Sequence, residues 1–399
     1  MSGRLRGLAA LALVAFAAFT SSCDRHVVDG IDLAELVPPE RLEAVAEAVE
    51  RAGRNGPTLA HALSDAPAGD REALAFILSN MPTVDLARVE RAFLLETVAL
   101  AREARERFPW GATVPEDVYL TYVLPPRVSQ EPLEPWRPFL YRELSARLEG
   151  TTSMREAALE VNRWCGERVG FQPTQRRDQG VFETLASGYG RCEEMMIVHI
   201  SALRSVCIPA RQAWTPYWAA SDNNHAWTEL WVDGAWHYTG ACEPRDELDD
   251  AWFSGPAGEA ALVLSAVFGE PAAGEDVYRR EERFALVNST ERYGPTGVLR
   301  VSCERAGGPV SDERIAVSLW NFGALRAIAG PRTDEDGTAE IALGDGRYVV
   351  SAGDSLGHDW KLVSVTAGDT TDAALEFTER RPFEGVFRLV HAPGGGEDE

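Results

Sequence analysis

Apolar residues three and four positions apart mark the first part of the chain as helical. Residues 35 to 109 are rich in Ala, Leu, Glu and Arg, and the helical period is clearest from Ala73 to Leu78 and from Leu86 to Ala101. This spacing places the apolar side chains on one face of each segment and predicts a helical region. Proline and glycine then interrupt the pattern from Phe108 to Pro138, so the stretch up to residue 145 is predicted to be an irregular crossing segment.

The helical period returns twice in the middle of the chain and then gives way to alternation. A helix is predicted from Ser153 to Val169, followed by a polar loop from Phe171 to Gly180. A second helix is predicted to begin at Cys192, because apolar residues follow it at helical spacing: Met195, Met196, Val198, Leu203 and Val206. From His225 to Val232 the residues alternate with period two, and Asp233-Gly234 is typical of a type I′ turn, which together predict a β-hairpin.

The last part of the chain is predicted to be a small β-sandwich. Five strand-like stretches are separated by turn residues, at 297–303, 315–320, 338–343, 347–352 and 362–366. We place this domain at residues 294–380, after a polar and charged stretch at 271–293 that is expected to be a linker or an edge segment. The tail at 381–399 ends in an acidic, glycine-rich stretch from residue 394 that lacks the apolar residues needed to fold.

The N-terminal segment has the features of an export signal. Arg4 and Arg6 precede an apolar run from Leu8 to Phe19, which is too short to span a bilayer permanently. Small residues directly before Cys23 resemble a bacterial lipobox, although Thr20 stands where leucine is usual. We expect a signal peptide at residues 1–22, lipid on Cys23, a tether at 23–34 and membrane anchoring in the cell envelope. The alternative is an ordinary signal peptide followed by a coincidental cysteine.

Charge and cysteine spacing argue against several classes of function. The formal net charge is −23 with no basic cluster, so repulsion from phosphates argues against a nucleic acid partner. The five cysteines after Cys23 match no disulfide scaffold and no zinc site, and no loop has the carboxylate spacing of a calcium site. We therefore expect no metal and no other cofactor.

Cys192 and His225 are the candidate reactive pair. The first turn of a helix offers unpaired backbone N–H groups and a favourable dipole, which are expected to lower the pKa of the Cys192 thiol. A cysteine at the start of a helix and a histidine on a later strand can form a thiolate–imidazole pair.

The region around this pair resembles the transglutaminase-like superfamily of papain-related thiol enzymes. The resemblance covers about residues 146–270 and is carried by Gly188-Tyr189-Gly190-Arg191-Cys192, Cys207-Ile208-Pro209-Ala210-Arg211, His225-Ala226-Trp227-Thr228-Glu229-Leu230 and Trp236. It implies an α+β protein whose papain-like core, with an antiparallel sheet, lies between the helical N-terminal region and the C-terminal β-sandwich. The sandwich itself looks like prealbumin-like or carboxypeptidase-regulatory-like modules, from the stretches Thr333 to Ala339 and Leu343 to Tyr348.

The third member of the expected triad departs from the family pattern. The family places an aspartate four residues after the tryptophan that matches Trp236, and Gly240 stands there instead. A one-residue bulge at Gly240-Ala241 would set Glu243 opposite His225, so Glu243 is the expected third catalytic residue and Asp222 the nearest substitute. The alternative is that the acid has been lost.

Two other side chains are candidates for the same site. Papain-type sites use a side-chain donor to stabilise the oxyanion, and Gln179 is the candidate here, with Gln172 and Gln175 as rivals. Trp218, in the loop before His225, is expected either to line a substrate cleft or to belong to the core. Aromatic residues of the crossing segment are expected to pack, with a share in the cleft as the alternative: Trp110, Tyr119, Tyr122 and Trp136.

The expected function is that of an exported cysteine protease or amidase. Its substrate would be a protein, a peptide or a peptidoglycan-like polymer, attacked at a peptide or carboxamide bond. Transamidation, in which an amine takes the acyl group, is the alternative reaction. A surface binding module that has lost turnover is the alternative without an enzyme activity, and the glycine at position 240 is the feature that favours it.

Overall fold

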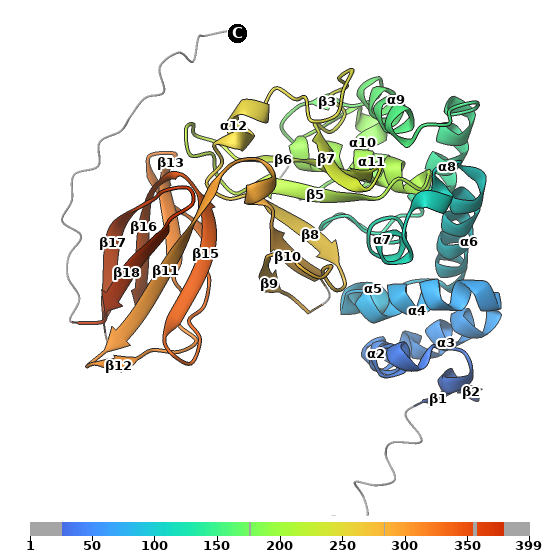
Figure 1. Ribbon diagram of the computed structural model, residues 1–399. Helices are drawn as coiled ribbons and strands as arrows, with labels where there is room; N and C mark the ends of the chain where they lie inside the picture. Colours follow the sequence, from blue (N-terminus) through green and yellow to red (C-terminus); the bar gives the residue numbers. More distant parts are fainter. Residues whose placement is uncertain (1–25, 175–176, 283, 354–356, 379–399) are drawn as a thin grey trace, which may run out of the picture.

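A computed structural model describes residues 26–174, 177–282, 284–353 and 357–378 of the chain. Figure 1 shows helices at one end, a β-sheet in the middle and a β-sandwich at the other end, as the sequence predicts for an α+β protein. The predicted signal peptide, Cys23 and the tail from residue 381 lie outside the described residues. Within those residues, no helix is both long and apolar enough to cross a membrane.

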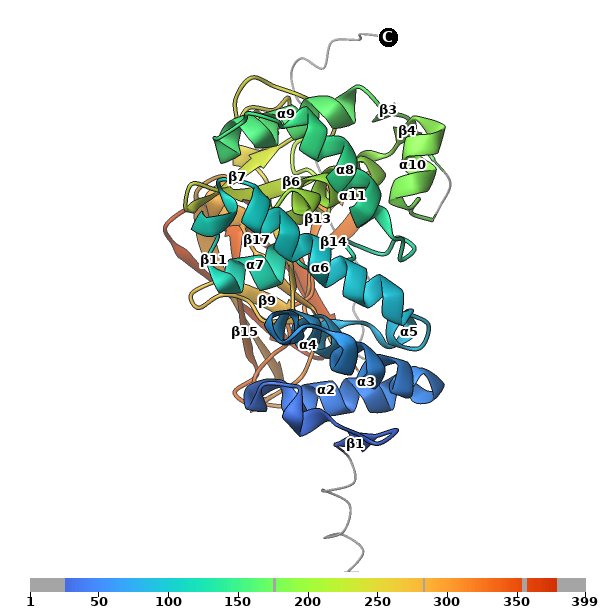
Figure 2. The same ribbon diagram turned by 90° about the vertical axis from the view of Figure 1, so that its right-hand side faces the viewer.

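The predicted N-terminal helical region consists of α2 (Pro39–Arg51), α3 (Gly56–Asp65), α4 (Arg71–Asn80), α5 (Thr83–Leu86) and α6 (Arg91–Arg107). Figures 1 and 2 both place α2 to α4 at the end of the molecule that lies away from α9 and α10. Leu63 and Leu78 of this region belong to the same hydrophobic core as Ile197 and Leu203 of the later helix α11. The helices therefore share one core with the centre of the molecule.

The crossing segment is more regular than predicted, because it contains α7 (Glu116–Tyr122) and α8 (Trp136–Arg147). Pro115 and Pro135 stand at the N-caps of these helices, where a missing N–H costs no intrahelical hydrogen bond. The prolines thus precede helices at positions where they are tolerated. The four aromatic residues of the segment are buried, which supports packing over a role in the cleft: Trp110, Tyr119, Tyr122 and Trp136.

Two buried arginines hold the crossing segment against α11. Arg204 of α11 donates hydrogen bonds to the carbonyl oxygens of Tyr122 at 3.1 Å and Arg127 at 2.8 Å. Arg137 donates to the carbonyl oxygens of Arg204 and Val123, both at 2.9 Å. Burial lowers the pKa of Arg137 to about 10 and that of Arg204 to about 9. Backbone carbonyls rather than carboxylates are the direct hydrogen-bond partners of these two cations.

The centre of the molecule is a six-stranded sheet with the order β7-β6-β5-β8-β10-β9. Its strands are β5 (Ala210–Thr215), β6 (His225–Val232), β7 (Ala235–Thr239), β8 (Leu264–Phe268), β9 (Val277–Arg280) and β10 (Phe284–Asn288). Of the two expectations for residues 271–293, the structure agrees with an edge segment and not with a linker, since β9 and β10 lie there and extend the sheet to its edge. Charged residues interrupt the alternating pattern that would indicate strands here, because a strand at the edge of a sheet exposes much of its surface to water.

Helices and short elements surround one face and one end of this sheet. They are α9 (Met154–Gly166), α10 (Val181–Ser187), α11 (Cys192–Ser205), α12 (Ser254–Gly258), β3 (Gly170–Phe171) and β4 (Tyr189–Gly190). The helices predicted from Ser153 and from Cys192 are both present, with Ser153 as the N-cap of α9. The remaining short elements are β1 (Val27–Val28), β2 (Ile31–Asp32), η1 (Leu33–Glu35), η2 (Gly53–Asn55), η3 (Ala68–Asp70), η4 (Gly111–Thr113) and η5 (Thr290–Arg292).

The predicted β-sandwich is present and is docked on the central sheet. One sheet contains β11 (Thr296–Arg305), β12 (Gly308–Pro309), β15 (Thr338–Gly344) and β18 (Thr370–Glu376), and the other contains β13 (Ala316–Asn321), β14 (Ala324–Ala329), β16 (Gly346–Gly353) and β17 (His358–Val365). Leu264 and Leu286 of the central sheet belong to the hydrophobic core of the sandwich. This shared core joins the sandwich directly to the sheet (Figure 1).

Candidate active site

The chain places Cys192 at the first position of α11 through a tight local structure. Gly188 ends α10 in the left-handed region, with φ 77°, and β4 then pairs Gly190 with Phe171 of β3. A Cβ atom on Gly190 would lie 2.9 Å from the Cβ of Glu194, so glycine permits this close approach. The backbone N–H of Arg191 donates to the carboxylate of Glu194 at 2.6 Å, which caps the helix directly before the cysteine.

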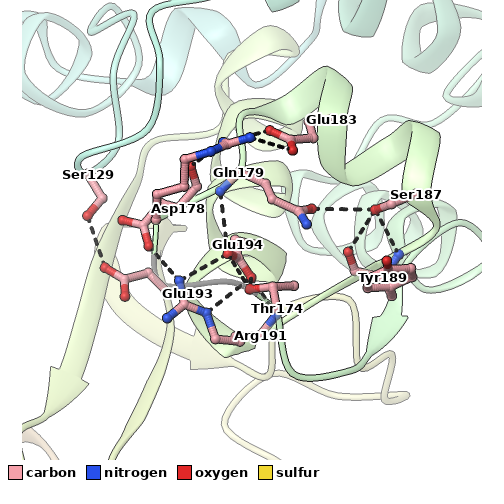
Figure 3. A network of polar contacts seen from close by, with 11 residues as sticks. Ser129, Thr174, Asp178, Gln179, Glu183, Ser187, Tyr189, Arg191, Glu193 and Glu194 are labelled. Atoms are coloured by element: carbon pink, nitrogen blue, oxygen red, sulfur yellow. Dashed lines mark hydrogen bonds and ion pairs between the residues drawn. The ribbon is translucent and has the colours of Figure 1, made fainter.

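A polar network fixes the residues on both sides of Cys192 (Figure 3). Glu194 is fully buried and accepts hydrogen bonds from the Thr174 hydroxyl at 2.7 Å and from the Arg191 guanidinium at 3.0 Å. Arg191 also pairs with Asp178 at 2.7 Å, and Ser129 donates to Glu193 at 3.2 Å. The network ties the loop before α10 and the crossing segment to the start of α11.

The fold brings the start of β6 beside the start of α11. His225 is the first residue of β6 and pairs with Thr215 of β5. Directly after it, the backbone N–H of Ala226 donates toward the Cys192 sulfur, and the N–H of Glu193 is a second donor. Both donors stabilise negative charge on the sulfur.

The protonation states of the pair differ from the expectation for Cys192. Burial raises the pKa of the Cys192 thiol above its ordinary value, although the N–H group of Ala226 acts in the opposite direction. The prediction that the helix start lowers this pKa was therefore wrong, because removal of the sulfur from water outweighs the backbone donors. Burial also lowers the pKa of His225 to about 4. At neutral pH the resting site thus holds a thiol and an uncharged imidazole.

Aromatic rings surround the imidazole of His225. The rings of Trp252 and Phe253 both lie 4.8 Å from it, and those of Trp227 and Trp218 lie 5.9 and 6.3 Å away. The Nε2 atom of His225 is buried and has no hydrogen-bond partner among the described residues. The orientation of the ring therefore depends on packing.

The burial of two of these tryptophans decides which of them packs in the core and which lies beside the solvent. Trp218 is only 4% exposed and stacks on Trp227 with an interplanar angle of 3°, so it packs behind the imidazole and does not line an open cleft. Trp252 is 54% exposed and lies at the solvent side of His225. Sequence analysis missed Trp252, because its signal was a single tryptophan after the acidic stretch Asp246 to Asp250.

Glu243 reaches the site by a turn and not by the predicted bulge. Strand β7 ends at Thr239, and the N–H of Glu243 donates back to the carbonyl oxygen of Gly240 at 3.4 Å. This turn folds the Glu243 carboxylate onto Gly240, where a Cβ atom would overlap with Glu243 Oε2. The carboxylate thus occupies the space into which a side chain at position 240 would extend.

The Glu243 carboxylate contacts His225 through an intermediate side chain. Its Oε2 atom accepts a hydrogen bond from Trp252 Nε1 at 3.0 Å, and the Trp252 ring packs on the imidazole. Within the described part of the chain, no hydrogen bond joins Glu243 to His225. Burial raises the pKa of Glu243, and the Trp252 N–H opposes that shift.

The other candidate side chains lie elsewhere. Gln179 accepts a hydrogen bond from Ser187 at 3.4 Å through its amide oxygen, and its described hydrogen bonds do not include Cys192 (Figure 3). The N–H of Gln172 donates to the carbonyl oxygen of Gly190, two residues before Cys192, at 3.0 Å, and Gln175 lies outside the described residues. Asp222 accepts a hydrogen bond from the N–H of Phe322.

A cavity of about 1040 Å³ lies beside the start of α11. Its wall includes Ser129 and Asp178, which contact Glu193 and Arg191 on either side of Cys192. The rest of the wall comes from the helical region and from residues 127–135, with a mainly apolar part formed by Pro82, Val84, Val89, Phe93, Pro132 and Leu133. The helical region therefore contributes to the surroundings of the site, through residues that sequence analysis did not single out.

The described residues contain no group of three or more His, Cys, Asp and Glu side chains that could hold a metal ion. His199 is buried and contacts Thr228 at 3.1 Å, and His237 contacts Asp249 at 2.6 Å. Cys165, Cys207, Cys242 and Cys303 are buried free thiols.

Comparisons with known proteins give one family match and several distant structural neighbours. A search of curated proteins finds no match. Among solved structures, a protein from Cytophaga hutchinsonii provisionally assigned as a cysteine protease is 16% identical with a TM-score of 0.25, over 38% of this chain and 58% of the other. A DUF3823 family protein from Parabacteroides merdae is 20% identical with a TM-score of 0.19, over 21% and 47%. The minor pilin GBS52 of Streptococcus agalactiae is 10% identical with a TM-score of 0.18, over 45% and 86%.

These structural matches span about half the length of the first two proteins and are distant. The family comparison is more direct, because residues 142–240, which include both Cys192 and His225, match the family model of the transglutaminase-like superfamily. The chain therefore carries a transglutaminase-like domain at residues 142–240.

Proposed function

We propose that this protein is a thiol hydrolase that cleaves peptide or carboxamide bonds through Cys192 and His225. The observation that carries the proposal is the placement of the Cys192 sulfur at a helix start, beneath the N–H group that directly follows His225. The proposed nucleophile and base thus come from two elements whose first residues lie side by side, an arrangement that thiol catalysis can use.

The reaction follows from the resting protonation states. His225 is neutral at neutral pH, so it can accept the thiol proton as the Cys192 sulfur attacks the carbonyl carbon. The tetrahedral intermediate then collapses, the imidazolium returns the proton to the leaving amine, and a thioester remains. Water, deprotonated by the same imidazole, attacks the thioester and releases a carboxylic acid and the free thiol.

Glu243 is the proposed third member of the site. The imidazolium formed during the reaction needs a nearby negative charge, and the Glu243 carboxylate lies one tryptophan away in the space of the missing side chain at position 240. Trp252 is more than half exposed, and its displacement is the movement by which we propose that the carboxylate approaches the imidazole.

The cavity beside α11 is the proposed binding surface for a polymeric substrate, and Cys192 and His225 themselves are not among the residues that line it. Small-molecule sites typically measure about 300–1,000 Å³, so a cavity of about 1040 Å³ can hold several residues of a chain. Its wall combines aliphatic and proline side chains with charged ones, among them Arg88, Glu96 and Arg127, and contains a single aromatic ring, Phe93. This favours a polypeptide segment over a glycan, which would stack on aromatic faces.

Export and anchoring remain part of the proposal. A signal that ends at Cys23 would place the enzyme in the cell envelope with its N-terminus in a membrane. Mass spectrometry of the mature N-terminus and detergent partitioning test this, and an unmodified N-terminus at another residue would refute it.

The activity is tested with purified protein and a panel of peptides and carboxamides, with and without a small primary amine. We expect free acid or cleaved peptide to dominate at high amine concentration and Cys192→Ala to abolish it. Predominant amine adduct would assign transamidation instead. No product from any substrate, with Cys192 inert toward thiol-directed warheads, would favour a binding module.

A further inference from the structure

The turn between β13 and β14 of the β-sandwich reaches the loop that precedes His225. The side-chain amide of Asn321 donates two hydrogen bonds to this loop, to the carbonyl oxygens of Trp218 at 3.0 Å and Ser221 at 2.8 Å. The N–H of Phe322 donates a third, to the carboxylate of Asp222 at 2.6 Å. The sandwich thus holds residues 218–222 of the catalytic domain at three points.

The side chain of Asn321 makes no other described hydrogen bond. It is only 1% exposed, and in the part of the chain that the structure describes its buried amide oxygen has no hydrogen-bond partner. Burial of an amide with an unpaired oxygen costs free energy, and the two hydrogen bonds that Asn321 donates to the loop are what offsets this cost.

The loop that Asn321 holds carries a ring that packs on the imidazole. Trp218 belongs to this loop, and its ring lies 6.3 Å from the imidazole of His225 and 6.2 Å from the ring of Trp227. Since Nε2 of His225 has no hydrogen-bond partner within the described residues, the surrounding rings contribute to the orientation of the imidazole. A displacement of the loop would therefore move one wall of the histidine pocket.

We propose that Asn321 is a positioning residue, through which the β-sandwich fixes the imidazole of His225 for reaction at Cys192. The catalytic unit then includes the sandwich, which is more than a spacer. This inference rests on the proposed thiol hydrolase function for its catalytic part, while its structural part can be measured without turnover.

Asn321→Asp tests the inference with almost no change in side-chain volume. It replaces two N–H donors with an oxygen that faces two carbonyl oxygens, so the loop should detach. We expect amide hydrogen exchange in residues 216–224 to accelerate at least about 10-fold. We also expect kcat to fall about 10- to 100-fold with a small change in KM, because misplacement of a catalytic group acts mainly on the chemical step.

Tyr278→Phe is the matched control. The Tyr278 hydroxyl accepts a hydrogen bond from the N–H of Gly330 at 2.7 Å, which also joins the central sheet to the sandwich but lies on β9, away from the loop. This variant should leave kcat and exchange in residues 216–224 unchanged. Equal effects of the two variants would overturn the inference, since the sandwich would then act only through general stability.

The rate of Cys192 alkylation by iodoacetamide separates this inference from the proposed function. If the wild-type protein turns over no substrate, the hydrolase proposal fails, but Asn321→Asp should still change the alkylation rate at least about threefold through the displaced imidazole. A loop that exchanges faster with an unchanged alkylation rate would overturn the positioning role. Unchanged exchange in the loop would overturn the contact itself.

Discussion

At the residue scale, the reactive pair of the resting site is uncharged, and charge separates only when the thiol reacts with substrate. Burial raises the pKa of the Cys192 thiol and lowers that of His225 to about 4. A thiolate–imidazolium pair would have the opposite shifts. Attack and proton transfer therefore have to occur together, with the Ala226 and Glu193 N–H groups ready to receive charge on the sulfur.

This arrangement predicts a simple pH dependence for alkylation of Cys192. The rate should rise in one step, with its midpoint above the ordinary thiol pKa of about 8.5, because only the thiolate reacts. Iodoacetamide kinetics across the pH range, with Cys192→Ala to subtract the other thiols, measure it. A plateau of fast reaction in mildly acidic solution would instead reveal an ion pair.

Glu243 gives the second prediction at this scale. Glu243→Gly should lower kcat/KM by about 100-fold, because the imidazolium loses its only proposed counter-charge. Adding Gly240→Asp should restore much of the activity, since φ of Gly240 lies outside the left-handed region and the overlap with Glu243 has been removed. Kinetic parameters of the single and double variants measure the effect.

Trp252→Phe is the control for the intervening indole, because it keeps an aromatic ring at this position, although a smaller one, and removes the N–H that holds Glu243. Full activity of Glu243→Gly would show that the site works without this carboxylate.

At the scale of elements, the start of α11 depends on one buried carboxylate. Burial alone would raise the pKa of Glu194, but hydrogen bonds from Arg191 and Thr174 lower it, so the group is ionised at neutral pH. Its bonds join the helix start to the loop that contains Thr174 and Asp178. The cap and the loop are thus one unit with the nucleophile at its end.

Glu194→Ala should therefore destabilise the protein by about 1–3 kcal/mol, since the N–H and guanidinium of Arg191 lose a buried partner. Glu194→Gln keeps an acceptor oxygen and should cost less. Urea unfolding midpoints measure the difference. The exposed pair Arg177–Glu183 is the control, and Glu183→Gln should change stability by no more than about 1 kcal/mol.

At the scale of the whole molecule, two buried histidines link folding to pH. Burial lowers the pKa of His225 to about 4 and that of His199 to about 3. In the unfolded chain both would titrate near pH 6.5, so below about that pH the unfolded state binds more protons than the folded state. Their contribution to stability is complete above about pH 6.5 and is lost as the pH falls through the folded pKa values.

His199→Gln tests this contribution away from the proposed reacting groups. Between about pH 6 and pH 4, the free energy of unfolding of the variant should fall less steeply, by up to about 1.4 kcal/mol per pH unit. Urea titrations at several pH values measure both slopes, and comparison with the wild type cancels the carboxylates that titrate in the same range. Parallel slopes would contradict the assignment of a neutral, buried His199.

The sequence by itself determined the elements whose cause is local. Periodicity predicted the helix that begins at Cys192 and the strand that begins at His225, and Asp233-Gly234 predicted the hairpin with both φ values positive. These features depend on residues within a few positions of one another, so a linear pattern records them. The patterns also predicted the terminal sandwich and suggested the pairing of the two reactive residues, and the resemblance added the α+β architecture with its papain-like core.

Only the tertiary structure decided what depends on burial and on contacts between distant segments. It reversed the expected pKa shift of Cys192, replaced the bulge at Gly240 with a turn, and brought Trp252 and Asn321 to the surroundings of His225. Desolvation of the sulfur depends on everything packed around it, and the contact from Asn321 spans 103 residues of chain. A pattern of neighbours along the sequence carries no record of either, because both arise when separate elements pack against one another.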